Sequence, residues 1–247
     1  VEFEEYRVMF EAEDTHWWYR GLRGAIFTLL SLDRAPRHRV RILDAGCGTG
    51  GNMAGLRAHG FTQVDGCDFS ETAISFCHAR GLKNVYRSSL TEMPFADDTY
   101  DIVISCDVVS DAGIKSDAEA LAELYRVLKP GGRLFLNLPA LKMLTGEHDR
   151  ATSIARRYTA REIAEKLEKA GFEMRRVTYR TMLLFPLVLA VRLARPDKGQ
   201  AARSDISVPP APINALLTGI MRLEQLLLRR PGLPIGSSVS VVARKPG

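Results

Sequence analysis

A glycine cluster that follows a short apolar run is the part of this sequence whose residue types most clearly point to chemistry. The run 40–44 (VRILD) predicts a buried strand, and glycines follow it before a predicted helix over 53–59. Glycines between a strand and a helix let the backbone approach a ligand at the carboxyl end of the strand. Gly46, Gly48 and Gly51 also fit the G-x-G-x-x-G fingerprint of dinucleotide sites. The cluster predicts a nucleotide site without choosing the nucleotide.

Two acidic residues narrow that choice. Asp68 ends a second predicted strand. Its carboxylate can accept hydrogen bonds from two ribose hydroxyls, whether the ligand is NAD or S-adenosylmethionine. Asp44 lies two residues before the first glycine, where its charge would repel a pyrophosphate. The same charge attracts a ligand with an ammonium group and a sulfonium centre, as in S-adenosylmethionine. Asp44 therefore favours a cationic nucleoside over NAD.

Around these residues the sequence resembles the class I S-adenosylmethionine-dependent methyltransferases, over residues 39–140. The resemblance implies S-adenosylmethionine as cofactor and methyl transfer to an oxygen or nitrogen of a small-molecule acceptor by in-line displacement. The motifs occur in the order of that family. They are Asp44-x-Gly46-x-Gly48-x-Gly50, Asp68-Phe69, Ser89-Leu90 before Thr91–Phe95, Asp97–Val103 leading to Cys106-Asp107, and Arg126–Gly132.

The resemblance also assigns residues to the cofactor. It implies that Asp68 binds the ribose, that Phe69 packs on the adenine, and that Ser89-Leu90 meets the adenine edge. Cys106 and Asp107 lie at the tip of the fourth strand, where cofactor and acceptor meet in this family. The predicted cofactor residues are Asp44, Gly46, Cys47, Gly48, Asp68, Phe69, Ser89, Leu90 and Cys106, together with Tyr19 and Arg23.

Tyr19 and Arg23 belong to an N-terminal segment, His16–Arg23 (HWWYRGLR), that is similar to a cofactor-covering helix in a subgroup of these enzymes. The methionine carboxylate needs a cationic or hydroxyl partner, because an unpaired buried carboxylate is costly. Tyr19 and Arg23 are four residues apart on one helical face and are the candidates. One of Trp17 and Trp18 is expected to anchor the core, and Trp18 is a candidate acceptor contact.

No residue is identified as a catalytic base. Displacement at a sulfonium needs no protonation of the leaving group, and a base is required only when the acceptor loses a proton. The family often has a His shortly after the fourth strand, whereas this sequence has Asp111 there, which leaves the inherited acid–base role unassigned. Asp111 and His148 are the two candidates. The predicted acceptor contacts are Trp18, Asp107, Arg157 and Tyr158.

An α/β sheet is needed to bring these residues together. Apolar runs alternate with amphipathic stretches from residue 39, which predicts a Rossmann-like, mostly parallel sheet of seven strands. Helices are expected on both faces, and the last strand is expected to be antiparallel. The predicted strands are 40–44, 63–68, 85–87, 100–105, 133–138, 172–180 and 238–243, and the helices among them are 53–59, 71–80, 116–128 and 159–171.

Two segments lie outside this alternation. Residues 1–36 are predicted to form an N-terminal cap region with a helix over 15–32, and residues 37–247 the methyltransferase domain. An insertion at about 181–235 holds an apolar helix near 183–194, a Pro/Gly/Ser/Asp-rich link and an amphipathic helix over 213–229. Its role stays open among a lid over an apolar acceptor, a membrane-interface contact, a dimer contact and ordinary packing.

Composition and charge bound the rest. The chain has 247 residues, of which 46% are hydrophobic, so it can bury a core and is not disordered. Its four cysteines lack C-x-x-C spacing, so reduced thiols and no metal site are expected. The net charge of +5 is uneven, since residues 175–247 carry 12 Lys+Arg against three Asp+Glu. The basic residues of this last third would attract an anionic partner, such as nucleic acid or anionic lipid.

Several partners and locations can be weighed from the same features. There is no secretory signal, and the longest apolar run, 182–191, is too short to span a bilayer, so a cytoplasmic protein is expected. A peripheral membrane contact through the basic, apolar insertion is left open. Nucleic acid is disfavoured, because basic residues are interleaved with aliphatic rather than aromatic ones. The chain is expected to be a monomer or a homodimer.

Two other functions remain as alternatives. One is an NAD-dependent oxidoreductase, which Asp44 and the Pro130-Gly131-Gly132 turn disfavour. The other is a catalytically inactive partner protein that keeps the methyltransferase fold, for which the departure at Asp111 would be a sign.

Overall fold

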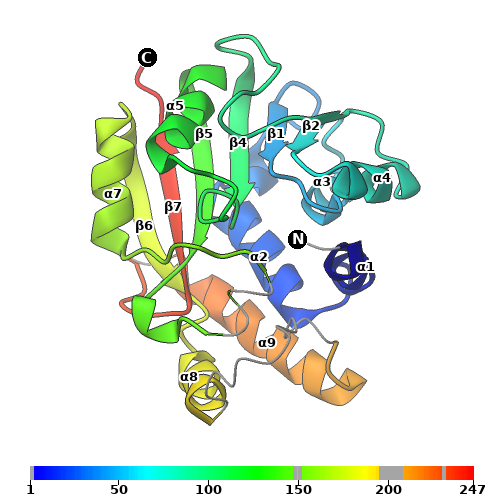
Figure 1. The fold of residues 1–247 in the computed structure, drawn as a ribbon, viewed down its shortest axis with the longest axis vertical. Helices are drawn as coiled ribbons and strands as arrows, with labels where there is room; N and C mark the ends of the chain where they lie inside the picture. Colours follow the sequence, from blue (N-terminus) through cyan, green and yellow to red (C-terminus); the bar gives the residue numbers. More distant parts are fainter. Residues whose placement is uncertain (1–2, 147–148, 150–151, 195–207, 230–231) are drawn as a thin grey trace.

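The computed structural model describes residues 3–146, 149, 152–194, 208–229 and 232–247, arranged around one seven-stranded sheet (Figure 1). The strands are β1 (Arg41–Ala45), β2 (Gln63–Asp68), β3 (Val85–Arg87), β4 (Tyr100–Cys106), β5 (Leu128–Pro139), β6 (Glu173–Arg180) and β7 (Ser238–Arg244). Their order is β3-β2-β1-β4-β5-β7-β6. Neighbours from β3 to β5 are parallel, whereas β7 is antiparallel to both β5 and β6. The predicted fold class is therefore confirmed.

Helices cover both faces of this sheet. They are α1 (Phe3–Ala12), α2 (Trp17–Leu29), α3 (Gly51–Ala58), α4 (Glu71–Ala79), α5 (Asp117–Val127), α7 (Ala160–Lys169), α8 (Phe185–Ala194) and α9 (Ala211–Leu227), with 3-10 turns η1 (Leu32–Arg34) and η2 (Lys142–Leu144). In β1, Leu43 belongs to the apolar cluster that contains side chains of α5 and α7, whereas Ile42 belongs to the cluster that contains side chains of α2, α3 and α4. Burial on both sides is typical of central parallel strands and explains the apolar run.

One helix and one strand start differ from the predictions. No helix was predicted over Phe3–Ala12, although Arg7 makes i,i+3 and i,i+4 ion pairs with Glu4 and Glu11 that support α1. β5 begins at Leu128, five residues before the predicted start. Leu128 pairs with Tyr100, and a shift of register after that pair absorbs the Pro-Gly-Gly turn. The turn therefore lies inside the strand, and α5 ends before it.

α9 packs against α2 through two glycines of the N-terminal segment. A Cβ atom on Gly21 would lie 2.8 Å from Met221 Cε, and one on Gly24 would lie 1.9 Å from Gln225 Nε2. The Asn214 side chain also accepts a hydrogen bond from the first backbone N–H of α2, at 3.0 Å. The insertion between β6 and β7 is thus held against the N-terminal helix, as α2 and α9 in Figure 1 show.

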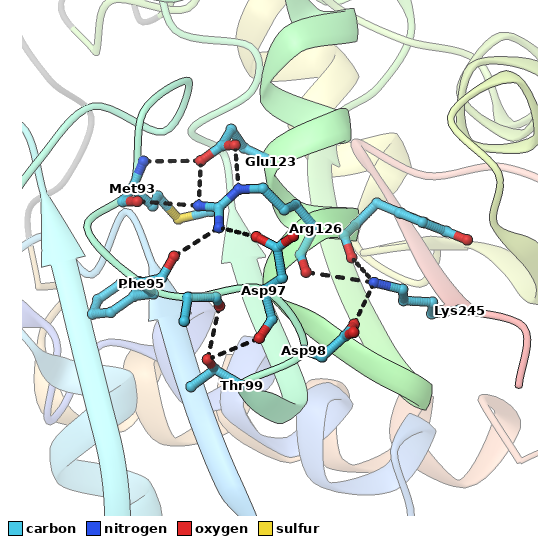
Figure 2. Close-up of polar contacts among 10 residues, drawn as sticks. Met93, Phe95, Asp97, Asp98, Thr99, Glu123, Arg126 and Lys245 are labelled. Carbon is cyan, nitrogen blue, oxygen red and sulfur yellow. Dashed lines mark hydrogen bonds and ion pairs between the residues drawn. The ribbon is translucent and has the colours of Figure 1, made fainter.

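The loop that leads into β4 is held by Arg126 of α5, as Figure 2 shows. Its guanidinium donates to the backbone carbonyls of Met93 at 3.1 Å and Phe95 at 2.7 Å, and to the Asp97 carboxylate at 2.7 Å. Hydrogen bonds to a charged donor are stronger than neutral ones. Arg126, which belongs to the last of the motifs quoted above, therefore has a structural role, because it fixes the chain that follows the predicted adenine loop.

Within the described part of the chain, no helix is both long and apolar enough to cross a bilayer.

Candidate active site

A cavity of about 1170 Å³ lies at the carboxyl ends of β1, β2 and β4. Its wall comes from α1, α2, the loop after β1, the end of β2, the tip of β4 and α8. Most predicted site residues line it. These are Trp18, Tyr19, Gly46, Cys47, Gly48, Asp68, Phe69, Ser89, Leu90, Cys106, Asp107, Asp111 and Arg157. The wall does not include Asp44, Arg23 or Tyr158, and His148 lies outside the described residues.

The glycine loop has a shape that side chains would block. Gly46 has φ +80°, and a Cβ atom there would lie 2.1 Å from Val108 Cγ2. The N–H groups of Gly46 and Cys47 donate to the Cys67 carbonyl at 2.8 and 2.9 Å, which ties the loop to the end of β2. The loop therefore presents its backbone to the cavity, as the strand–glycine–helix order predicts.

Asp68 is held in place by its neighbours' backbone. Its Oδ2 accepts from Gly48 N–H and its Oδ1 from Ser70 N–H, each at 2.9 Å. Each carboxylate oxygen has a second lone pair, so acceptor capacity remains for ligand hydroxyls. Desolvation raises the pKa of Asp68 above its ordinary value. Positive charge or donors from a ligand would offset that cost of burial.

Phe69 exposes 73% of its surface although it lines the cavity. Replacing it by Ala is expected to leave the free energy of unfolding nearly unchanged, because little of the ring is buried. Affinity for S-adenosylhomocysteine is expected to fall about tenfold or more, since stacking of a base on an aromatic ring contributes roughly 1–3 kcal/mol. Calorimetric titration measures this. Met143→Ala, a 67% exposed side chain outside the cavity wall, is the control, and equal affinities for both variants would contradict the adenine role.

Asp44 is an unpaired acid in the protein interior. Its side chain is 0% exposed, and neither oxygen has a hydrogen-bond partner among the described residues. Burial, with the charges of Glu13 and Asp68, raises the pKa of Asp44 well above its ordinary value, and Asn52 opposes this without making a hydrogen bond of good geometry. A buried carboxylate without partners is costly. Asp44 lies behind the cavity wall, two residues before Gly46 of that wall, and a ligand that brings positive charge to the cavity would offset this cost.

Glu13, just after α1, is a cavity residue that was not predicted. Its side chain is buried and accepts hydrogen bonds from Thr49 Oγ1 and from Arg80 Nη2, the latter at 3.1 Å. Desolvation raises the pKa of Glu13 to about 7. Glu13, Asp44 and Asp68 thus place three acidic side chains in this region, of which Glu13 is ion-paired with Arg80.

The two candidates for the methionine carboxylate occupy different places. Tyr19 lines the cavity, and burial together with the charge of Glu13 raises the pKa of its phenol, so it stays a neutral donor. Arg23 donates instead to the Glu13 backbone carbonyl at 2.7 Å. Tyr19 is thus placed to meet a ligand in the cavity, and the role of Arg23 stays a prediction.

Asp107 is the acid at the tip of β4. Asn137 Nδ2 donates to both of its carboxylate oxygens at 3.2 Å, and desolvation raises the pKa of Asp107 to about 6 against the opposing charge of Arg180. Arg180 is fully buried, donates to Asn137 Oδ1 at 2.9 Å and lies 5.7 Å from the centroid of the Trp18 ring. Arg180 therefore orients Asn137, and Asn137 orients Asp107. Neither of these two supporting residues was predicted.

The remaining candidates make local contacts. Asp111 Oδ1 accepts from the backbone N–H two residues on at 2.7 Å, so it shapes a turn and caps no helix. Arg157 is buried and paired with both carboxylate oxygens of Asp149, at 2.6 and 2.7 Å. The buried Tyr158 donates its hydroxyl to a carboxylate of α5 at 3.1 Å. Of the two proposed bases, Asp111 is at the cavity wall and His148 lies beyond the described residues.

Together, the strand order, the glycine loop and the acid that ends β2 define a Rossmann-like methyltransferase fold. A solved S-adenosylmethionine-dependent methyltransferase from Archaeoglobus fulgidus is similar in fold, with a TM-score of 0.58 over 92% of this chain and 94% of that chain at 19% identity. In sequence, residues 43–136 match the family described as the methyltransferase domain. The match of residues 43–136 and the named relatives thus support the predicted class I S-adenosylmethionine-dependent methyltransferase, and S-adenosylmethionine is the cofactor of that family.

Two relatives match this chain in sequence over part of their own length. A Mycolicibacterium smegmatis protein with the name "Probable S-adenosylmethionine-dependent methyltransferase" is 30% identical over 168 residues, which cover 66% of this chain and 62% of the relative. The malonyl-[acyl-carrier protein] O-methyltransferase of Herminiimonas arsenicoxydans is 34% identical over 139 residues, covering 53% and 52%. The matches span less than two thirds of these relatives.

Proposed function

We propose that this chain binds S-adenosylmethionine in the cavity and transfers its methyl group to an oxygen or nitrogen of a small apolar or amphiphilic acceptor. The observation that carries the proposal is that one cavity joins an acidic nucleotide region to an apolar wall, with Asp107 among the lining residues. Nucleic acid stays disfavoured as acceptor, and a cytoplasmic location stays a prediction.

The proposal that S-adenosylmethionine binds rests on the match between its charge and shape and those of the cavity residues. The glycine loop lines the cavity with Gly46, Cys47 and Gly48, Asp68 keeps acceptors for the ribose, and Phe69 offers an exposed ring for the adenine. The unpaired acid Asp44 and its neighbour Glu13 favour the cationic methionine end. When bound, S-adenosylmethionine supplies a methyl group on a sulfonium, whose departure needs no acid from the protein.

The proposal of an apolar or amphiphilic acceptor rests on the apolar side chains that α8 and η2 contribute to the cavity. Leu187, Val188 and Val191 of α8 line the cavity, together with Leu144 of η2. In Figure 1, α8 lies at the end of the molecule away from α3 and α4, so this wall is on the far side from the adenine region. Such a wall would bind an apolar body, because burying apolar surface is favourable.

Asp107 is the group we assign to the acceptor's proton. Its pKa of about 6 leaves it mostly ionised at neutral pH and above, so it can accept a hydrogen bond or a proton from a hydroxyl or amine. Asn137 fixes the carboxylate, and the buried Arg180 fixes Asn137. An acceptor that already has a free lone pair would need only the positioning.

Ligand-induced stabilisation tests the proposal. S-adenosylhomocysteine at about 100 times its Kd is expected to raise the free energy of unfolding by about 2.7 kcal/mol, whereas NADH is expected to have no effect. The measurement is thermal or urea unfolding with each ligand. Transfer of labelled methyl to a series of amphiphilic and polar acceptors then measures turnover.

Each alternative has its own outcome. Stabilisation by NADH alone would replace the proposal by an oxidoreductase. Binding of S-adenosylhomocysteine without methylation of any acceptor would favour an inactive partner protein that keeps the fold.

A further inference from the structure

α9 exposes four large apolar side chains, Ile213, Leu216, Leu223 and Leu226, and buries mostly polar ones. Its buried residues are Asn214, Thr218, Met221 and Glu224, of which three are polar. Leu216 and Leu223, seven residues apart and therefore on one side of the helix, are 64% and 55% exposed. An ordinary surface helix shows the reverse arrangement, with its apolar stripe toward the core. We define the outer stripe as Ile213, Leu216, Leu223 and Leu226, each of which exposes more than half of its surface.

The inverted arrangement is built into the packing. The Glu224 carboxylate accepts hydrogen bonds from the backbone N–H groups of Thr181, at 2.6 Å, and Leu183, at 3.1 Å, which hold α9 to the segment before α8. Asn214 joins the start of α2, and the two glycines of α2 let that helix approach closely. The helix therefore cannot roll its apolar side inward without breaking these contacts.

Exposed apolar side chains gather in this part of the fold. Thirteen large hydrophobic side chains are exposed among the described residues, and nine of them lie between 183 and 235. On α8, Leu187 and Val191 are 53% and 39% exposed and also line the cavity. Clustering of this kind marks an interaction surface rather than scattered surface residues.

The basic charge around this surface indicates which kind of partner binds it. Residues 181–235 contain seven Lys+Arg and three Asp+Glu, and one of those acids, Glu224, is buried against backbone N–H groups. Arg222 on α9 and Arg229, two residues after the end of α9, are both exposed. A second copy of the chain would bring two such basic surfaces together, which like-charge repulsion disfavours. An anionic surface is attracted instead.

We infer that the outer stripe of α9 and the exposed side of α8 dock this protein on an anionic phospholipid bilayer. The leucines enter the interface between headgroups and acyl chains, and Arg222 and Arg229 lie at the level of the phosphates. Because α8 also lines the cavity, an amphiphilic acceptor can pass from the bilayer to Asp107. That last step rests on the proposed function, whereas the docking itself does not.

Vesicle co-sedimentation tests the docking with the full chain. Wild type is expected to bind vesicles of phosphatidylcholine mixed with phosphatidylglycerol, with binding weakened by salt, and to bind pure phosphatidylcholine far less. Leu216→Gln/Leu223→Gln is expected to lower the affinity at least tenfold, because two apolar side chains leave the interface. Arg222→Gln/Arg229→Gln is expected to lower it about fivefold per charge, and only on the anionic vesicles.

Matched controls separate docking from folding and from catalysis. Tyr86→Gln on β3 and Arg161→Gln on α7 remove an exposed apolar and an exposed basic side chain elsewhere, and neither is expected to change vesicle binding. All variants are expected to melt like wild type and to keep their affinity for S-adenosylhomocysteine, which is read separately. Absence of binding to both kinds of vesicle overturns the inference while leaving the proposed function intact. A dimer in sedimentation velocity that the leucine variant dissociates, without vesicle binding, overturns it in favour of a second copy.

Discussion

Asp44→Asn is expected to stabilise the protein without cofactor and to weaken binding of S-adenosylmethionine at least tenfold. The buried carboxylate has no hydrogen-bond partner among the described residues, and burial raises its pKa well above the ordinary value of 3.8. A raised pKa means that ionisation opposes folding, so this group lowers stability progressively as the pH rises above the ordinary value. Asn keeps the shape without the charge. Near pH 8 the variant is expected to gain about 1–3 kcal/mol in free energy of unfolding.

The measurement is urea unfolding of both proteins at acid and alkaline pH, with calorimetric titration of the ligand. The gain is expected to vanish in acid, where the wild-type carboxyl is protonated. Asp33→Asn, an exposed residue outside the cavity wall, is the control and is expected to change neither quantity. If the Asn variant binds S-adenosylmethionine as tightly as wild type, attraction of a cationic ligand by Asp44 is wrong.

Gly46→Ala is expected to lower the free energy of unfolding by about 2–4 kcal/mol and to abolish cofactor binding. Two costs add at this position. The backbone φ of +80° is unfavourable for any L side chain, and the new Cβ would meet Val108 Cγ2 at 2.1 Å. Because the N–H of Gly46 is tied to the Cys67 carbonyl, the loop cannot shift without losing that hydrogen bond.

Two variants separate these costs. Gly81 has a similar φ of +77° with nothing within 4 Å of a Cβ atom, so Gly81→Ala is expected to show only the backbone cost, about 1–2 kcal/mol. Val108→Ala combined with Gly46→Ala is expected to recover part of the steric cost relative to the sum of the single variants. Equal losses for Gly46→Ala and Gly81→Ala in chemical unfolding would show that contact with Val108 contributes nothing.

Local patterns were sufficient for most of the fold. The strand before the glycines and the helices predicted from residues 116 and 159 are all present. Ser116 caps α5, and Thr159 and Glu162 form a capping box at α7, so each start depends on residues within four positions of one another. Asp68 and Phe69 follow a strand end that the sequence marks directly. Such elements need no knowledge of distant contacts.

Features that depend on distant partners were not predictable in this way. Glu13 lies in an acidic stretch where each residue looks solvated, and only its contacts with Thr49 and Arg80 bury it. Arg180 looks like one of several basic residues in β6, yet Asn137, which comes from β5, places it in the interior beside Asp107. The direction of an apolar stripe is equally hidden, since spacing shows that a helix has two sides and does not show which side meets the core.

β7 lies between β5 and β6, and this order constrains when the sheet can close during synthesis. β6 pairs with no other strand than β7 in the described chain, so β6 has no place in the sheet until residues 238–244 have left the ribosome. Until then, β5 keeps an unpaired edge beside the apolar side chains Leu134, Leu136 and Leu138. An open edge of this kind is a template for aggregation. The cofactor-binding half can therefore assemble early on the ribosome, whereas the half that carries Arg180 must wait, and a nascent chain paused between them is the species that most needs a chaperone.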